Sequence, residues 1–261
     1  MAQIAPKAEW KEDWINDTVY LHVFPRSFAK SVVNISPFAI KLELWLRINK
    51  IPFKVIDYNG MGSKGQSPFI FFNKKEIPDS NFIIEYLSEY FRVDPYPGLS
   101  ITDKAVARAF LKMIEENTSW AIFIYRYVEQ PDEFAEYFMP KAPADVKAAL
   151  QKTLQVSVRD RAQKHGIGRH SSEEVNKIGC DDIKAISAFL ANKKFLMGDN
   201  LFYCTLSDIY FTNKLILYTG PHRPLPLTCD LFFSIDVHSS EVSAMLLRST
   251  STTILISRKF V

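Results

Sequence analysis

The sequence has few cysteines, no long apolar run and no large excess of charge of one sign. Its three cysteines, Cys180, Cys204 and Cys229, form no CxxC pair and no metal-ligand spacing, which argues against a disulfide framework and fits a reducing compartment. No apolar run reaches the roughly 18–20 residues that a membrane-spanning helix needs. The net charge of +3, without a dense Lys/Arg cluster, argues against nucleic acid as a partner.

The N-terminal segment also lacks the apolar stretch of a secretory signal. Residues 1–17 are polar, with Trp10 and Trp14 interspersed, so we expect a cytoplasmic protein without an integral membrane segment. The five histidines are scattered. Only His165 and His170 share a polar loop, and no acidic or cysteine partner stands at ligand spacing, so we expect no metal site.

What the sequence does contain is enough apolar material for a sizeable core. Hydrophobic residues make up 47% of 261 residues, which suits one large or two modest domains. Residues 19–24 are β-prone, and Ser36-Pro37 has the pattern of a helix start, with a helix expected over residues 38–49. Residues 53–58 form the next predicted strand. The two strands should be parallel with a right-handed crossover, because a helix joins them.

A hairpin and a second helix are expected to complete this small α/β domain. Residues 68–72 and 76–78 read as strands joined by a turn over residues 73–75. Asp79-Ser80 then opens a helix over residues 81–91, with Ser80 well suited to the N-cap position. The domain should end near Arg92.

The start of the third predicted strand is the most informative segment. A proline entering an apolar run suits the first residue of a strand, and the Ser67–Pro68 bond there can be cis. Such a bond exposes the backbone N–H and C=O of Ser67 to a bound peptide. The helix that opens at Asp79-Ser80 attracts a carboxylate at its N-terminus. A peptide-pairing edge beside an anion site is what a thiol tripeptide such as glutathione needs.

The second half of the chain has a helical pattern. Residues 94–98 read as a linker because of their two prolines and glycine. The predicted helices cover residues 102–128 with an interruption near Asn117, residues 144–164, and residues 172–192 with a kink near Gly179.

The last part of the chain contains one more helix start and a region without helical periodicity. Thr205 and Asp208 form a capping box, a structural cap for a helix that continues to Leu217. Residues 219–261 are rich in Ser and Thr and form an atypical tail of uncertain structure.

This order of elements resembles the glutathione transferase superfamily. The segment Phe195-Leu196-Met197-Gly198-Asp199, followed by the Thr205 cap, is similar to that family's signature before a buried helix. Three further motifs resemble the failed-axon-connections branch, which also includes cadmium-responsive proteins of nematodes and is related to the metaxins. They are Tyr20-Leu21-His22, Ser36-Pro37-Phe38 with Lys41-Leu42-Glu43, and Asp79-Ser80 with Ile83-Ile84-Glu85.

The resemblance implies an α+β fold over roughly residues 19–217. A thioredoxin-like, glutathione-binding-type domain would occupy residues 19–92, and an all-α domain of the glutathione transferase type would occupy residues 100–218. Residues 219–261 depart from the family pattern.

The resemblance also implies a catalytic hydroxyl at Ser36. Ser36-Pro37-Phe38-Ala39 is similar to the Cys-Pro-Phe-Ala of omega-class transferases, with a hydroxyl in place of the thiol, so conjugation remains possible and mixed-disulfide chemistry does not. The alternative is that Ser36 only caps its helix. Ser27 and Tyr20 are the other hydroxyl candidates.

For glutathione binding, the resemblance implies two contact points. The backbone of Ser67, next to a cis Pro68, would pair with the cysteinyl group. Ser80 would donate to the γ-glutamyl carboxylate and Asp79 would receive its ammonium. The alternative is a plain strand start and a plain helix cap. Lys64 and Gln66 are possible neighbours of the site.

Three functions are left open at this stage. One is a glutathione transferase-like enzyme, a possible homodimer, with an electrophile bound between the domains in detoxification or a stress response such as that to cadmium. The second is a non-catalytic adaptor that binds protein partners in axon development or at organelles. The third is a stress-response protein that lacks catalysis of its own.

Overall fold

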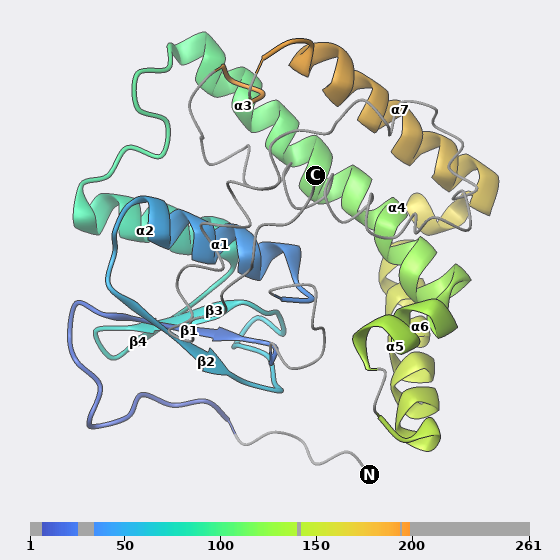
Figure 1. Cartoon of the computed structure of the whole chain (residues 1–261), viewed down its shortest axis with the longest axis horizontal. Coiled ribbons are helices and arrows are strands. Elements are labelled where there is room, and N and C mark those ends of the chain that lie inside the picture. Colours follow the sequence, from blue (N-terminus) through green and yellow to red (C-terminus); the bar gives the residue numbers. More distant parts are fainter. Residues whose placement is uncertain (1–6, 26–33, 140–141, 194, 199–261) are drawn as a thin grey trace, which may run out of the picture.

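The computed structural model describes residues 7–25, 34–139, 142–193 and 195–198 (Figure 1). The predictions for Ser27, Thr205, Asp208 and residues 219–261 lie outside this range.

A four-stranded mixed sheet forms the centre of the first domain. Its strands are β1 (Val19–Val23), β2 (Phe53–Asp57), β3 (Phe69–Phe72) and β4 (Lys75–Pro78), in the order β2-β1-β3-β4. The predicted parallel pairing of β1 with β2 is confirmed, with α1 (Pro37–Ile48) between them in the chain. β3 runs antiparallel to both β1 and β4.

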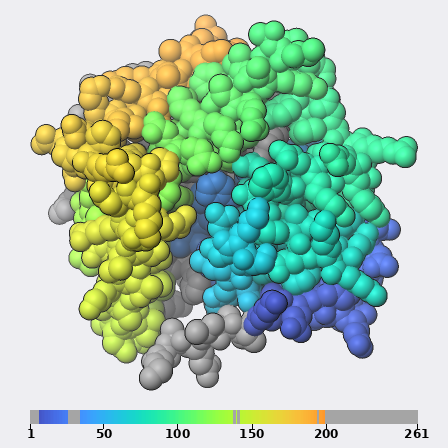
Figure 2. Space-filling model, turned by 180° about the vertical axis from the view of Figure 1, so that it is seen from behind, coloured from blue at the N-terminus to red at the C-terminus, as the bar shows by residue number. Residues whose placement is uncertain are grey.

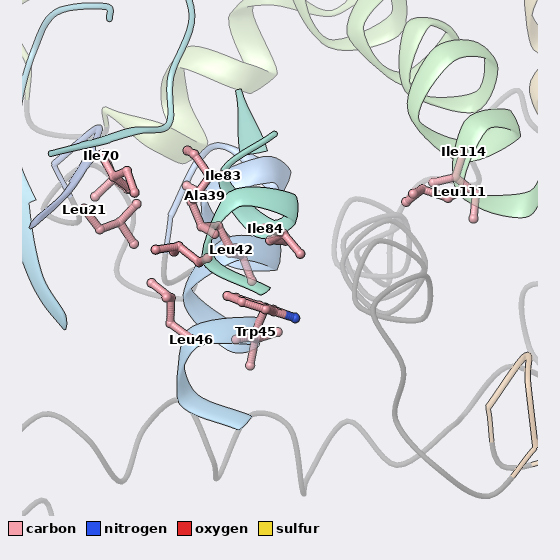
Figure 3. Packing of buried hydrophobic residues seen from close by; sticks show 14 of the residues in the cluster. Leu21, Ala39, Leu42, Trp45, Leu46, Ile70, Ile83, Ile84, Leu111 and Ile114 are labelled. Atoms are coloured by element: carbon pink, nitrogen blue, oxygen red, sulfur yellow. The ribbon is translucent and has the colours of Figure 1, made fainter. Parts of the chain in front are cut away.

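Two helices cover one face of the sheet, α1 and α2 (Ser80–Phe91) (Figure 1). Leu42 and Leu46 of α1 are fully buried and lie beside Leu21 and Ile70 of the sheet (Figure 3). Trp45 points away from the sheet, toward the side on which the second domain lies. The helix α1 thus packs against the sheet on one side and faces the second domain on the other, which explains why most of its surface is apolar.

An N-terminal arm, residues 7–17, runs along the opposite face of the sheet (Figure 1). Trp14 stacks on Tyr20 of β1, and Trp10 meets the same ring edge-on. Between β2 and β3 the chain forms turns and no helix. The arm therefore supplies apolar cover for this face, which the sequence did not predict.

The second domain is helical. Its described residues form α3 (Ile101–Met113), a π turn (Ile114–Thr118), α4 (Ser119–Ile124), a second π turn (Tyr125–Glu129), α5 (Pro131–Phe138), α6 (Ala144–His165), a 3-10 turn (Ile167–Arg169) and α7 (Ser172–Leu190). The predicted interruption near Asn117 is confirmed as the first π turn.

The helix α5 lies between the ranges that were predicted as helical. Pro131 occupies its first helical position, where its missing N–H costs nothing. The helix α7 continues through Gly179. A Cβ at Gly179 would lie 3.0 Å from the Cβ of Ala121, so this glycine allows a close approach of α4 and α7.

Among the described residues, no helix combines the length and the apolar character that crossing a bilayer requires.

Candidate functional site

The strand register brings the predicted site segments to one end of the sheet. Phe69 at the start of β3 pairs with Pro78 at the end of β4 and with His22 near the end of β1. Ser67 and Pro68 immediately precede β3, and Asp79 and Ser80 immediately follow β4, so these pairs lie side by side. The helix α1 also begins at this end, because it follows the loop that leaves β1.

Ser36 occupies the N-cap of α1, as predicted. Its Oγ accepts a hydrogen bond from the Ala39 N–H at 3.4 Å, and Pro37 takes the first helical position. The cap uses a lone pair of the hydroxyl, so its proton remains available for donation. A donor at a helix N-terminus can stabilise an anion such as a thiolate. The same geometry also serves a cap without any ligand.

Asn34, which the sequence analysis missed, fixes the position of Ser36. Its Oδ1 accepts from the Ser36 N–H at 2.9 Å, and its Nδ2 donates to the Phe24 carbonyl at 2.7 Å. The buried amide thereby ties the start of α1 to the end of β1. An asparagine two residues before a helix cap is the signal, because such side chains bond to backbone two residues ahead.

Tyr20 does not belong to this end of α1. It is buried in the aromatic cluster on the opposite face of the sheet, where its hydroxyl accepts from the Ile15 N–H at 2.7 Å. Of the hydroxyl candidates in the described range, Ser36 is therefore the one at the helix start.

The Ser67–Pro68 peptide bond is cis, as the sequence predicted. β3 starts at the next residue, Phe69. The loop before it is compact: the Gly62 N–H donates to the Gln66 carbonyl at 2.9 Å. Gln66 and Ser67 are thus held beside the strand that Pro68 precedes.

The cap of α2 is Asp79, and the prediction that Ser80 is the N-cap was wrong. Asp79 Oδ1 accepts from the N–H groups of Asn81 at 2.9 Å and Phe82 at 3.3 Å. The helix therefore starts one residue earlier than expected, and Ser80 is its first, buried residue. Both bonds fall on Oδ1, so the cap does not use the second carboxylate oxygen.

Asp79 adopts an uncommon backbone conformation, with φ of 75° and ψ of 120°. A residue with a side chain pays on the order of 1–3 kcal/mol for such a conformation, and strain of this kind clusters at binding sites. The turn directs the chain from β4 into α2 with the helix N-terminus at the end of the sheet.

Lys64 is a neighbour of this helix start. Its Nζ lies 4.4 Å from the centroid of the Phe82 ring, which is exposed on the first turn of α2. A cation beside a helix N-terminus adds to the positive potential that an anionic ligand would meet.

Lys41 and Glu115 were not predicted as site residues. They form a buried ion pair, with Nζ 2.5 Å from Oε1, and Asn81 contacts both of them. Burial lowers the pKa of Lys41, while Glu115 and Asp79 oppose that shift. The signal in the sequence is a lysine inside an apolar helix pattern.

Among the described residues, no group of three or more His, Cys, Asp or Glu side chains is arranged to hold a metal ion.

Comparison with known proteins extends the resemblance from motifs to most of the chain. Residues 37–132 match the glutathione S-transferase N-terminal domain. The chain is 29% identical over 232 residues to failed axon connections of Drosophila melanogaster, covering 80% of this chain and 54% of that protein. It thus spans about half the length of that relative. It is also 29% identical over 185 residues to isoprene-epoxide–glutathione S-transferase of Rhodococcus sp. (strain AD45), covering 66% of this chain and 77% of that protein.

Solved structures agree on the fold. Beta-etherase LigF from Sphingobium sp. strain SYK-6 matches with a TM-score of 0.54 at 15% identity, covering 88% of this chain and 99% of that one. Glutathione transferase Omega 3C from Trametes versicolor matches with a TM-score of 0.51 at 11% identity, covering 91% and 93% of the two chains. At such identities the likeness concerns the fold alone, an α+β arrangement of a thioredoxin-like domain and a helical domain. The chain is thus similar to proteins of the glutathione transferase superfamily, near its failed-axon-connections branch, and is a glutathione transferase-like protein.

Proposed function

We propose that the protein binds glutathione at the end of the sheet where Ser67–Pro68 meets Asp79–Ser80. The observation that carries this proposal is the pairing of Phe69 with Pro78, because it sets a strand start next to a helix N-terminus. An extended peptide can pair with the first, and a carboxylate can bind at the second.

In this proposal, each contact has a chemical role. The backbone of Ser67 pairs with the cysteinyl group, the Ser80 hydroxyl donates to the γ-glutamyl carboxylate, and the second carboxylate oxygen of Asp79 receives the ammonium. The Ser36 hydroxyl donates to sulfur and so favours ionisation of the thiol, which passes its proton to water. The thiolate forms a C–S bond with a small electrophile while the bond to the leaving group, or one bond of an epoxide, breaks.

The electrophile would bind between the two domains. Figure 2 shows a hollow between the side chains of α6, drawn in yellow, and those of the sheet domain, drawn in cyan, with part of α1 visible inside it. Since Ser36 caps α1, a substrate in this region could reach the sulfur. The similarity to isoprene-epoxide–glutathione S-transferase supports conjugation as the reaction.

Retention on immobilised glutathione tests the binding site. The native chain should be retained and then eluted by free glutathione, whereas Ser80→Ala should pass through. Ser88→Ala is the matched control, because Ser88 lies on the same helix and its buried Oγ has no hydrogen-bond partner in the described part of the chain. Equal retention of the native chain and Ser80→Ala would contradict the proposed carboxylate contact.

The role of Ser36 is tested by conjugation of glutathione to 1-chloro-2,4-dinitrobenzene. Ser36→Gly keeps most of the cap energy and loses the hydroxyl, so its turnover should fall at least 10-fold while its stability changes by only a few tenths of a kcal/mol. Ser36→Thr should retain activity. Full activity in Ser36→Gly would leave the residue with the capping role alone.

A non-catalytic adaptor is the second candidate, and the similarity to failed axon connections favours it. In this alternative the scaffold binds protein partners in axon development or at organelles. Partner capture that is unchanged in Ser36→Gly and Ser80→Ala, from a chain that does not bind glutathione, would support it.

We also propose the domain limits 19–92 and 100–218, a homodimer, a cytoplasmic location and a part in stress or cadmium response. The segment between α2 and α3 supports the domain boundary, because it contains no helix or strand. Limited proteolysis should cut there first.

The other three points have separate tests. Analytical ultracentrifugation tests the homodimer, cell fractionation tests the cytoplasmic location, and transcript levels after cadmium exposure test the part in stress response.

A further inference from the structure

A closed triangle of buried polar contacts joins the two domains next to the proposed glutathione site. Lys41 of α1 donates to Asn81 Oδ1 at 2.8 Å and to Glu115 Oε1 at 2.5 Å. Asn81 Nδ2 donates to Glu115 Oε2 at 2.8 Å. The side chains of Lys41 and Glu115 are only 1% and 2% exposed. Each corner comes from a different element: α1, α2 and the first π turn of the second domain.

The Asn81 amide satisfies both charged groups at once. Burying an ion pair costs several kcal/mol per ion and is offset only when the remaining hydrogen bonds are also made. The amide oxygen accepts from the ammonium and the amide nitrogen donates to the carboxylate, so it fits both partners. Buried polar networks of this kind hold their members in one arrangement.

Asn81 is also part of the helix start that the proposed site uses. It follows Ser80 directly, and its backbone N–H donates to the carboxylate of Asp79. Asn81 thus connects the cap of α2, through its backbone, to Lys41 and Glu115, through its side chain. The side-chain contacts of Asn81 reach 34 residues ahead to Glu115, so the first turn of α2 is held by the second domain.

The π turn explains why Glu115 can make this contact. Glu115 is buried toward the first domain, whereas the adjacent Glu116 is exposed and pairs with Lys112 on the surface. On its other side the turn is held by α7, because Asp182 accepts from Thr118 Oγ1 at 2.6 Å and from Asn117 Nδ2 at 2.9 Å. π turns of this kind are frequent at functional sites.

We propose that Glu115 and Lys41 are positioning residues, which hold Asn81 and thereby set the first turn of α2 for an anionic ligand. This inference rests on the proposed glutathione site. It adds that the affinity of this site for glutathione depends on docking of the second domain against the first. The ligand group concerned is the γ-glutamyl carboxylate, and the rest of the tripeptide is unaffected.

Asn81→Ala is the sharpest variant, because it removes the connection to α2 and leaves the ion pair, the Asp79 cap and Ser80 in place. Hydrogen exchange of the ligand-free chain should become at least 10-fold faster at the amides of residues 79–84 and remain unchanged in α6 and α7. Glu115→Gln should show the same local effect. Glu116→Gln is the matched control on the exposed side of the same turn and should show none.

Binding measurements separate positioning from a general loss of structure. Glutathione affinity should fall about 10-fold in Asn81→Ala, whereas the affinity for cysteinylglycine, which lacks the γ-glutamyl group, should not change. A fall in both affinities, or unchanged exchange at residues 79–84, would overturn the proposal. If the native chain binds no glutathione, the proposed function fails, while local exchange still decides whether these residues set the helix start.

Discussion

Trp14 lies flat on Tyr20, with ring centroids 4.0 Å apart and an angle of 4° between the planes. The contact joins the N-terminal arm to the first strand of the sheet. It is reinforced by the Ile15 N–H, which donates to the Tyr20 hydroxyl at 2.7 Å. Because this face of the sheet carries no helix in the described residues, the arm keeps the aromatic side chains of β1 and β3 from water.

Trp14→Ala should destabilise the protein by about 2–3 kcal/mol, since it removes a partly buried aromatic side chain and its stacking contact with Tyr20. The expected result is a lower midpoint of urea unfolding. Ile15→Ala is the control, because Ile15 is 62% exposed and contributes little apolar burial. Equal midpoints for the native chain and Trp14→Ala would show that the arm is dispensable for stability.

His22 should make the stability of the first domain depend on pH. Burial lowers its pKa from 6.5, with Lys11 acting in the same direction and the Tyr20 carbonyl and Glu76 opposing. The unfolded chain therefore binds a proton more readily than the folded one, so the contribution is fully present above about pH 6.5 and is lost as the pH falls through the folded value.

Urea unfolding at pH 8 and pH 5 checks this prediction. The native chain should lose more stability over this interval than His22→Gln, which has no group that titrates there. An identical loss in both would assign the pH dependence to other groups.

The sequence predicted those parts of the fold and site that depend on local pattern. The parallel strands around α1 follow from apolar runs separated by a helix, and the position of Ser36 follows from the Ser-Pro start of that helix. The turn at Asn73 and Lys74, both with positive φ, makes β3 and β4 a hairpin. Its register pairs Phe69 with Pro78, so the segment before β3 meets the segment after β4.

The remaining features depend on contacts between distant residues. Lys41 and Glu115 are 74 residues apart, and nothing local in the sequence pairs them. The arm with Trp14 was read as a polar segment, because its cover of the sheet depends on the absence of a helix between β2 and β3. The cap at Asp79 was misplaced by one residue, since both Asp and Ser are good caps and the choice depends on the turn out of β4.

Gly179 should be intolerant of larger side chains. A Cβ there would already lie 3.0 Å from the Cβ of Ala121, so Gly179→Val should push α4 and α7 apart and cost about 1–3 kcal/mol by overpacking. Thermal unfolding measures the loss. Adding Ala121→Gly should restore part of the stability of Gly179→Val, and a double variant no more stable than the single one would argue against this contact.

Asp79→Gly should separate the structural and binding roles of the residue. Glycine adopts the φ of 75° without strain and is a fair N-cap, so the relief of roughly 1 kcal/mol or more should offset the lost capping bonds. The unfolding midpoint should therefore stay nearly unchanged. Glutathione binding should weaken about 10-fold, because the carboxylate that would receive the γ-glutamyl ammonium is gone. Unchanged affinity would limit Asp79 to its capping role, since the backbone of the turn is preserved in this variant.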